Sequence, residues 1–256
     1  MSRARLVPSL NLRQKSLIDM SFKNEVLRGF DYIEIWGAST VDDAHYNPVK
    51  LFDVKVGAGF RSPSLRRSTR IALDSNAEHT RFYFDLGDYA TLAPLPRIPT
   101  DNEVFFVRIR GHFANNGLFS AFGPIVCVPP YDFFTTTHPT FTFTAYAPQV
   151  PVGLLGVGEI PENLGEGCMN VHLPYFSQTV QVVNLDGTVD ALYMSFHPGM
   201  TPTEVPAGKE IGLTGAGVPE IFACSLAGTG LDVLAANGER KGVKFTIRMS
   251  LVNAGA

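Results

Sequence analysis

The segment from 104 to 134 constrains the fold most strongly, because its residues alternate between apolar and polar. Phe105, Val107 and Ile109 fall on one side of an extended chain, and the residues between them fall on the other. This period of two is typical of a β-strand with one buried face. The following Asn115-Asn116-Gly117 suits a tight turn, because asparagine and glycine accept the positive φ angles of hairpin turns. The segment therefore predicts a β-hairpin.

The opposite side of the first strand carries Arg108, Arg110 and His112, and we expect it to face solvent. The returning strand, 125–128, is apolar on both faces. Pro129-Pro130 ends it, because proline has no N–H to give to a strand ladder. Truncating the apolar side should therefore cost more stability than truncating the arginine side.

This hairpin resembles the last two strands of a fibronectin type III or related immunoglobulin-like domain. The matching residues are Phe105, Val107, Arg108, Ile109, the Asn-Asn-Gly turn, Ser120, Pro124, Ile125 and Val128. The resemblance implies a β-sandwich around the hairpin, and by itself it implies no function.

The rest of the chain also favours strands. Its 24 Gly, 18 Pro and 19 Phe, with 18% charged residues, suit short strands joined by many turns. The segment 148–167 interrupts the alternation with prolines and glycines, which marks a boundary. We predict an all-β protein with an extended arm over 1–16 and two β-sandwich units, immunoglobulin-like or jelly-roll-like, over 17–148 and 149–256.

Individual strands follow from the same alternation. A strand over 18–22 competes with a helix through Leu27, and 37–48 is predicted as a loop. Hairpin turns are predicted at 185–187 and 237–238. The other predicted strands are 32–36, 49–56, 71–73, 81–84, 141–145, 169–173, 178–184, 191–197, 211–213, 221–225, 231–235 and 243–251.

Basic residues gather in two places. The leader 1–16 is basic, poorly periodic and interrupted by Pro8, so we expect an arm and not a packed element. The segment 57–70 holds four arginines and no acid, typical of an exposed loop. Both could bind phosphates or an acidic protein surface, or could simply be solvated. The candidate partner-binding residues are Arg3, Arg5, Arg13, Lys15, Arg61, Arg66, Arg67 and Arg70.

Acidic residues gather elsewhere. The segment 151–238 holds nine acids and one base, Lys209, and the chain turns basic again after 238. Such polarity could orient subunits in an assembly. The sequence pI of about 6.1 and the scarcity of aromatics among the arginines argue against a nucleic-acid partner.

Recognisable catalytic or metal-binding motifs are missing from the sequence. The six histidines form no HxH or HExxH pair, and GxSxG does not occur. Asp42-Asp43 with His45, and Asp85 with Asp88, are the densest polar groups, but their spacing fits no calcium loop, and aspartate is common in turns. We therefore expect neither an enzyme nor a bound cofactor or metal.

Cys127, Cys168 and Cys224 lie far apart without a CxxC motif, which favours buried free thiols. No apolar run resembles a signal peptide or approaches the ~20 residues of a membrane span. We expect a protein made in a reducing host cytoplasm, without membrane partners.

The half from Gly153 onward resembles β-sandwich domains of tailed-bacteriophage virion proteins, particularly capsid decoration or cement proteins. The residues that carry the resemblance are Val205-Pro-Ala-Gly-Lys-Glu-Ile-Gly-Leu, Ile221-Phe-Ala-Cys-Ser and 242–249. The resemblance implies a virion structural protein, commonly a homotrimer, that binds the viral major capsid protein and stabilises the shell.

Two alternatives stay open. A jelly-roll major capsid protein would form the shell itself, with its basic arm directed toward the genome. A carbohydrate-binding or hydrolytic β-sandwich would need exposed aromatic residues clustered beside paired acids. Trp36, the single tryptophan, and eight scattered tyrosines supply little of that in sequence.

Overall fold

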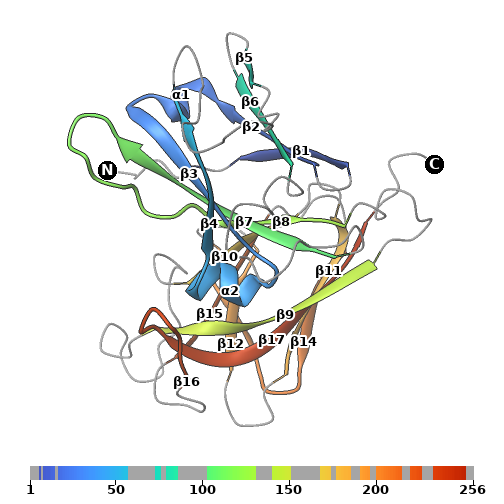
Figure 1. Ribbon diagram of the computed structural model, residues 1–256. Coiled ribbons are helices and arrows are strands. Elements are labelled where there is room, and N and C mark those ends of the chain that lie inside the picture. Colours follow the sequence, from blue (N-terminus) through green and yellow to red (C-terminus); the bar gives the residue numbers. More distant parts are fainter. Residues whose placement is uncertain are drawn as a thin grey trace. The chain divides into compact units, whose positions relative to one another are not determined.

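The described residues are mostly in β-strands, with two short helices among them, which confirms the predicted all-β class (Figure 1). The structure is a computed structural model that describes residues 6, 8–14, 17–56, 73–75, 79–85, 103–130, 140–150, 168–173, 177–185, 191–196, 200–214, 220–226 and 233–251. Two compact units divide the chain, Met1–Ser39 with Pro48–Asp132 and Thr40–Asn47 with Phe133–Ala256. The sandwich architecture of each unit stays a prediction.

The units divide at residue 132 and not near 148, where the prolines and glycines suggested a boundary. Strand β9 (Thr140–Val150) pairs antiparallel with β17 (Arg240–Leu251), the last strand of the chain. The alternation of threonine with buried residues such as Phe143 gives β9 one buried face. The strand therefore belongs to the sheet of the second unit.

The described residues of the first unit form two sets of antiparallel strands and one helix. One set runs in the order β1 (Ser9–Gln14), β2 (Leu17–Lys23), β6 (His79–Asp85) and β5 (Leu73–Ser75). The other runs β8 (Ile125–Val128), β7 (Phe105–Phe113), β3 (Phe30–Ala38) and β4 (Val49–Lys55). Helix α1 (Asn24–Leu27) follows β2 directly, so the segment predicted as strand or helix contains both in turn.

The prediction of an unpacked arm over 1–16 is wrong for the part of the leader that is described. Strand β1 pairs antiparallel with β2, and Leu6 is 1% exposed within the core of the first unit. A register shift between Leu10 and Leu12 interrupts the period of two. Such a bulge hides the alternation that identifies a strand in sequence.

The predicted hairpin is confirmed, with β7 and β8 as its strands. At its turn, Gly117 has a φ of 70° and its N–H donates to the carbonyl of Phe113 at 3.0 Å. The returning chain then stays hydrogen-bonded to β7, for example from the Ser120 N–H to the Gly111 carbonyl at 2.8 Å. Turn and strand pairing therefore fix the same register.

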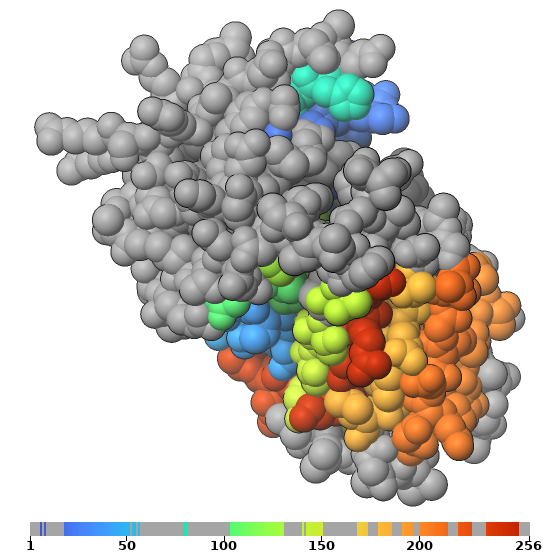
Figure 2. Space-filling model, turned by 90° about the vertical axis from the view of Figure 1, so that its right-hand side faces the viewer, coloured from blue at the N-terminus to red at the C-terminus, as the bar shows by residue number. Residues whose placement is uncertain are grey.

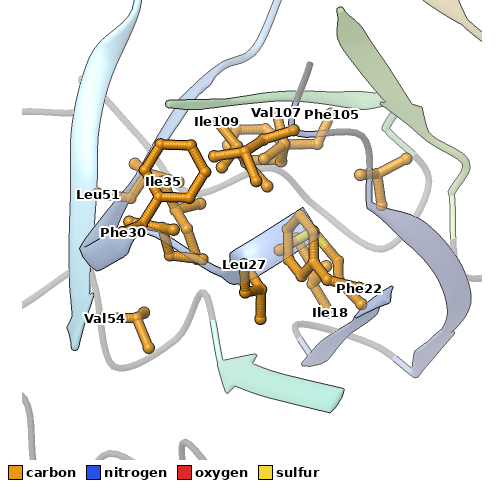
Figure 3. Close-up of a cluster of buried hydrophobic side chains, with 14 residues drawn as sticks. Ile18, Phe22, Leu27, Phe30, Ile35, Leu51, Val54, Phe105, Val107 and Ile109 are labelled. Atoms are coloured by element: carbon orange, nitrogen blue, oxygen red, sulfur yellow. The ribbon is translucent and has the colours of Figure 1, made fainter. Parts of the chain in front are cut away.

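The apolar face of the hairpin lies in the core of the first unit (Figure 3). Phe105, Val107 and Ile109 are each at most 1% exposed, as their alternation predicts. The other members of this core are Leu6, Ile18, Met20, Phe22, Leu27, Phe30, Ile33, Ile35, Leu51, Val54 and Val128. Side chains from β2, α1, β3, β4 and β7 thus share one core.

The second unit contains helix α2 (Val41–Tyr46) and a sheet that includes β9 and β17. The order in this sheet is β14 (Glu210–Thr214), β11 (Ser177–Asn184), β17, β9, β15 (Glu220–Leu226) and β10 (Met169–His172). β12 (Leu192–Ser195) pairs with β13 (Thr203–Val205) and β15, and β16 (Val233–Leu234) pairs with β17. β9 and β15 run parallel, whereas β10 with β15, β11 with β14, β11 with β17 and β9 with β17 are antiparallel.

Of the two predicted turns, the one at Asn237-Gly238 is confirmed, because Gly238 has a φ of 82° between the paired strands β16 and β17. The hairpin predicted around 185–187 is wrong. The strand before it, β11, pairs with β14 and β17, whereas the strand after it, β12, pairs with β13 and β15. Turn residues predict a reversal of the chain but do not determine which strands become neighbours.

Helix α2 occupies the segment 37–48 that was predicted as a loop. The Thr40 side chain accepts the Asp43 N–H at 3.0 Å and donates to the Asp43 carboxylate at 2.7 Å. This reciprocal arrangement satisfies a free donor of the first helical turn. The Thr-x-x-Asp spacing is therefore the local signal for this helix.

Candidate binding face

Four neighbouring strands of the second unit present an array of mostly polar side chains on one side of the sheet. Alternate residues of a strand share a face, so the strand register determines which side chains are neighbours. The three rows across β9, β17, β11 and β14 are Thr140–Ser250–Thr179–Thr214, Thr142–Arg248–Gln181–Gly212 and Thr144–Thr246–Val183–Glu210. We call these twelve residues the polar face, and Figure 2 shows its four strands side by side.

Every residue of the polar face is partly or fully exposed. On β9, β17 and β11 the described residues between them point to the other side of the sheet and are buried, with Val182 and Ile247 both 0% exposed. On β14, at the end of this order, Leu213 is 39% exposed. The polar face is therefore the solvent side of a sheet that is packed on its other side behind β9, β17 and β11. Such a support limits bending of the strands.

Side-chain contacts cross the strands within the polar face. The hydroxyls of Thr144 and Thr246 lie 3.1 Å apart, and those of Thr179 and Ser250 are also hydrogen-bonded. Ordered side chains lose less rotamer freedom on binding than free ones. The face is thus partly preorganised for a partner.

Positive charge lies near the middle of the face and negative charge at its edge. Arg248 on β17 is exposed, and its guanidinium donates to the neutral amide of Gln181 at 3.4 Å. Lys244 continues the same side of β17, with its Nζ 6.0 Å from the ring centroid of Tyr146. Glu210 is exposed on β14, the end strand of this order. The array therefore favours an anionic or hydrogen-bonding counterpart at its centre.

The dimensions of the face restrict the kind of partner. Strands lie about 4.8 Å apart and rise about 3.4 Å per residue, so the three rows cover roughly 15 Å by 15 Å. A stable protein interface buries about 800 Å² on each partner, several times this area. Small-molecule sites are instead mostly apolar pockets. The polar face fits one of several contacts with the surface of another protein.

The first unit carries a different polar cluster, on the outer side of β3. Glu34 is 3% exposed and accepts hydrogen bonds from Arg110 Nε at 2.6 Å, Lys50 Nζ at 3.0 Å and Trp36 Nε1 at 3.0 Å. Burial raises the pKa of Glu34, but the hydrogen bonds from these three donors outweigh it and hold the pKa below its usual value. Arg110 is therefore only partly exposed, at 25% of its side chain, and not fully solvated as the alternation suggested.

Aromatic rings complete the cluster around Arg110. Its guanidinium lies 4.9 Å from the ring centroid of Trp36, 4.3 Å from that of Phe119 and 4.9 Å from that of Phe122. Cation–π contacts of this kind stabilise a guanidinium that is partly removed from water. A ring face that carries an arginine cannot also stack on a sugar, so we interpret the cluster as a stabilising one.

The dense polar group noted in the sequence, Asp42-Asp43 with His45, lies in α2. Contacts from this helix hold it against the rest of the second unit. Asp42 accepts from Lys241 Nζ at 2.5 Å and from the Tyr146 N–H at 3.1 Å, and the Tyr46 hydroxyl donates to the Tyr146 carbonyl at 3.1 Å. His45 lies 3.2 Å from Glu239. Asp42, His45 and Tyr46 thus each contact another residue of the second unit. We therefore interpret this polar group as one that holds α2 in place. The Asp85 side chain and Asp88 lie outside the described residues.

Of the predicted partner-binding residues, only Arg13 lies on a described segment, where β1 places it opposite Ile18 of β2. The others, Arg3, Arg5, Lys15, Arg61, Arg66, Arg67 and Arg70, lie outside the described residues. The polar face was not predicted from the sequence, although its signals were present. Threonine alternates along β9, and Lys244 and Arg248 share one side of β17.

No protein-family model matches the chain, and neither does any curated protein. Neither of the two described helices is long and apolar enough to cross a membrane. The functional assignment therefore depends on the geometry and chemistry of the described surfaces.

Proposed function

We propose that this chain is a non-enzymatic structural protein of a viral particle, which binds the major capsid protein and stabilises the shell as a decoration or cement protein. The observation that carries the proposal is the polar face, an exposed array of mostly polar side chains on four neighbouring strands. Small-molecule sites are mostly apolar pockets, so such an array suits the surface of another folded protein better than it suits a small substrate.

A single contact of this size would be weak, and an icosahedral shell offers the same counterpart many times. A homotrimer would bring three polar faces to neighbouring capsomers, so that each bound face raises the effective concentration of the next. Several weak contacts made at once would thus hold the trimer on the shell and the capsomers together, with no chemical reaction.

Charge would set the register of docking. Arg248 and Lys244 would face acidic or carbonyl groups of the capsid protein, which favours rapid and correctly oriented encounter more than it adds affinity. The described part of the leader is paired within its own unit. The polar face therefore takes the role that the sequence suggested for a free arm.

The proposal is tested by fractionating particles from infected cells that produce this chain. An antibody raised against the purified chain should detect it in the gradient fractions that contain shells with nuclease-protected genomes. Washing at high salt should release the chain and leave the shells intact. A chain found only in the soluble fractions would refute the proposal, and shells that dissolve when it is released would identify it as the shell-forming protein.

A further inference from the structure

Two of the three cysteines lie opposite each other on neighbouring strands. Cys168 immediately precedes β10, and Cys224 lies in β15. These strands pair antiparallel with Met169 opposite Ala223, and the same register continued by one residue places Cys168 opposite Cys224. Opposed residues of an antiparallel pair have Cα atoms about 4.5–5.5 Å apart, a separation that a disulfide spans.

The surroundings of the two thiols differ. Cys224 is 0% exposed in a small apolar cluster with Phe222, whereas Cys168 is partly exposed and packs against that cluster. A hydrogen bond from the Cys224 thiol lowers the pKa of Cys168, and this bond together with burial raises the pKa of Cys224. Cys168 is therefore the accessible and more acidic partner.

We propose that Cys168 and Cys224 form a redox-active dithiol that closes to an intrachain disulfide on reaction with a small-molecule disulfide such as oxidised glutathione. The Cys168 thiolate attacks one glutathione sulfur, forms a mixed disulfide and releases one glutathione thiolate. The Cys224 sulfur then attacks the Cys168 sulfur, the bond from Cys168 to the glutathione sulfur breaks, and the Cys224 proton passes to the departing second glutathione. The protein is oxidised by two electrons, and oxidised glutathione is reduced to two molecules of glutathione.

The third cysteine serves as an internal reference. Cys127 lies in β8 of the first unit and is 1% exposed, and burial raises the pKa of its thiol. Its partner across β7 is Phe106, so no second thiol lies opposite it as Cys168 lies opposite Cys224. We therefore expect it to stay reduced when the other two have reacted.

Closure would join β10 and β15 covalently and restrict the unfolded chain between them. For a chain of this size, the midpoint of thermal unfolding of the oxidised protein should rise by about 5 °C or more. A reducing cytoplasm would keep the thiols free, and release from the cell would favour closure. The inference does not depend on the proposed attachment to a shell.

The experiment incubates the full-length protein with oxidised glutathione, blocks free thiols with a maleimide after denaturation and measures the intact mass. The reduced protein should carry three labels and the oxidised protein one, on Cys127, with a cross-linked peptide joining Cys168 to Cys224. Cys224→Ser should instead accumulate one glutathione on Cys168, and Cys127→Ser should close as the wild type does.

Three results would overturn the inference. The first is a wild-type protein that carries three maleimide labels at every ratio of oxidised to reduced glutathione. The second is a glutathione adduct that persists on Cys168 of the wild type, and the third is a disulfide between two chains. Each would mean that Cys224 is not placed to attack Cys168. All three can be read from the wild-type protein, so the test survives a variant that fails to fold.

Discussion

Glu34 is the residue around which the outer side of β3 is arranged. It is 3% exposed and is neutralised by hydrogen bonds from Arg110, Lys50 and Trp36. A buried carboxylate is tolerated only while such donors compensate for its lost hydration. Arg110 also rests on three aromatic rings, so it supplies both charge and packing.

Replacing Arg110 with alanine should lower the free energy of unfolding by about 2–4 kcal/mol, because Glu34 loses a donor while it stays buried. Ile109→Ala should cost about 2–5 kcal/mol through loss of core packing. Urea denaturation of both variants measures these costs. Arg28→Ala is the matched control at an exposed arginine, with an expected change within about 0.5 kcal/mol. An Arg110→Ala cost as small as this control would show that the cluster is not stabilising.

Stability should depend on pH through Glu34. Its pKa in the folded protein lies below the ordinary value of 4.5, so between the two values the unfolded chain binds more protons and stability rises with pH. The contribution is fully present above pH 4.5 and is lost as the pH falls through the folded value. Urea denaturation of wild type and Glu34→Gln across this acidic range provides the comparison. The variant should have the flatter dependence, and equal slopes would contradict the account.

Elements differ in how far local sequence determines them. The β7–β8 hairpin could be predicted because its alternation, its Asn-Gly turn and its terminating prolines are all local signals. β9 pairs with β17, and β14 lies at the end of the strand order. Both depend on strands far apart in the sequence, and the β-propensity of a segment does not determine its partner. The polar face combines residues of four such strands. Its threonines and cations could be read from the sequence, but their convergence could not.

The leader provides a prediction at the scale of an element. Deleting residues 1–14 removes β1 from its pairing with β2 and removes Leu6 from the core of the first unit. The deletion should therefore lower the midpoint of thermal unfolding, and Leu6→Ala alone should cost about 2–5 kcal/mol. A truncated protein that unfolds at the wild-type temperature would show that the leader is an independent arm after all.

For the whole molecule, the proposed attachment combines a rigid β scaffold with a salt-sensitive contact. Arg248 is exposed on the polar face and Lys244 is exposed beside it on β17, so added salt should screen their attraction to an acidic counterpart. Binding of the purified chain to salt-stripped shells should weaken as the ionic strength rises, which sedimentation at several salt concentrations measures. Binding that is independent of salt would indicate an apolar interface and would exclude the polar face as the contact.

The most direct test of the central claim is a rebinding measurement with charge-reversed variants. Shells stripped of the chain are mixed with wild type, Arg248→Glu on the polar face or Arg28→Glu on the exposed surface of the first unit, and the sedimented fraction is quantified. We expect Arg248→Glu to bind at least about tenfold more weakly, since several copies of the contact are weakened together. Arg28→Glu should bind as wild type does. Equal binding by all three proteins would contradict the assignment of the polar face as the docking surface.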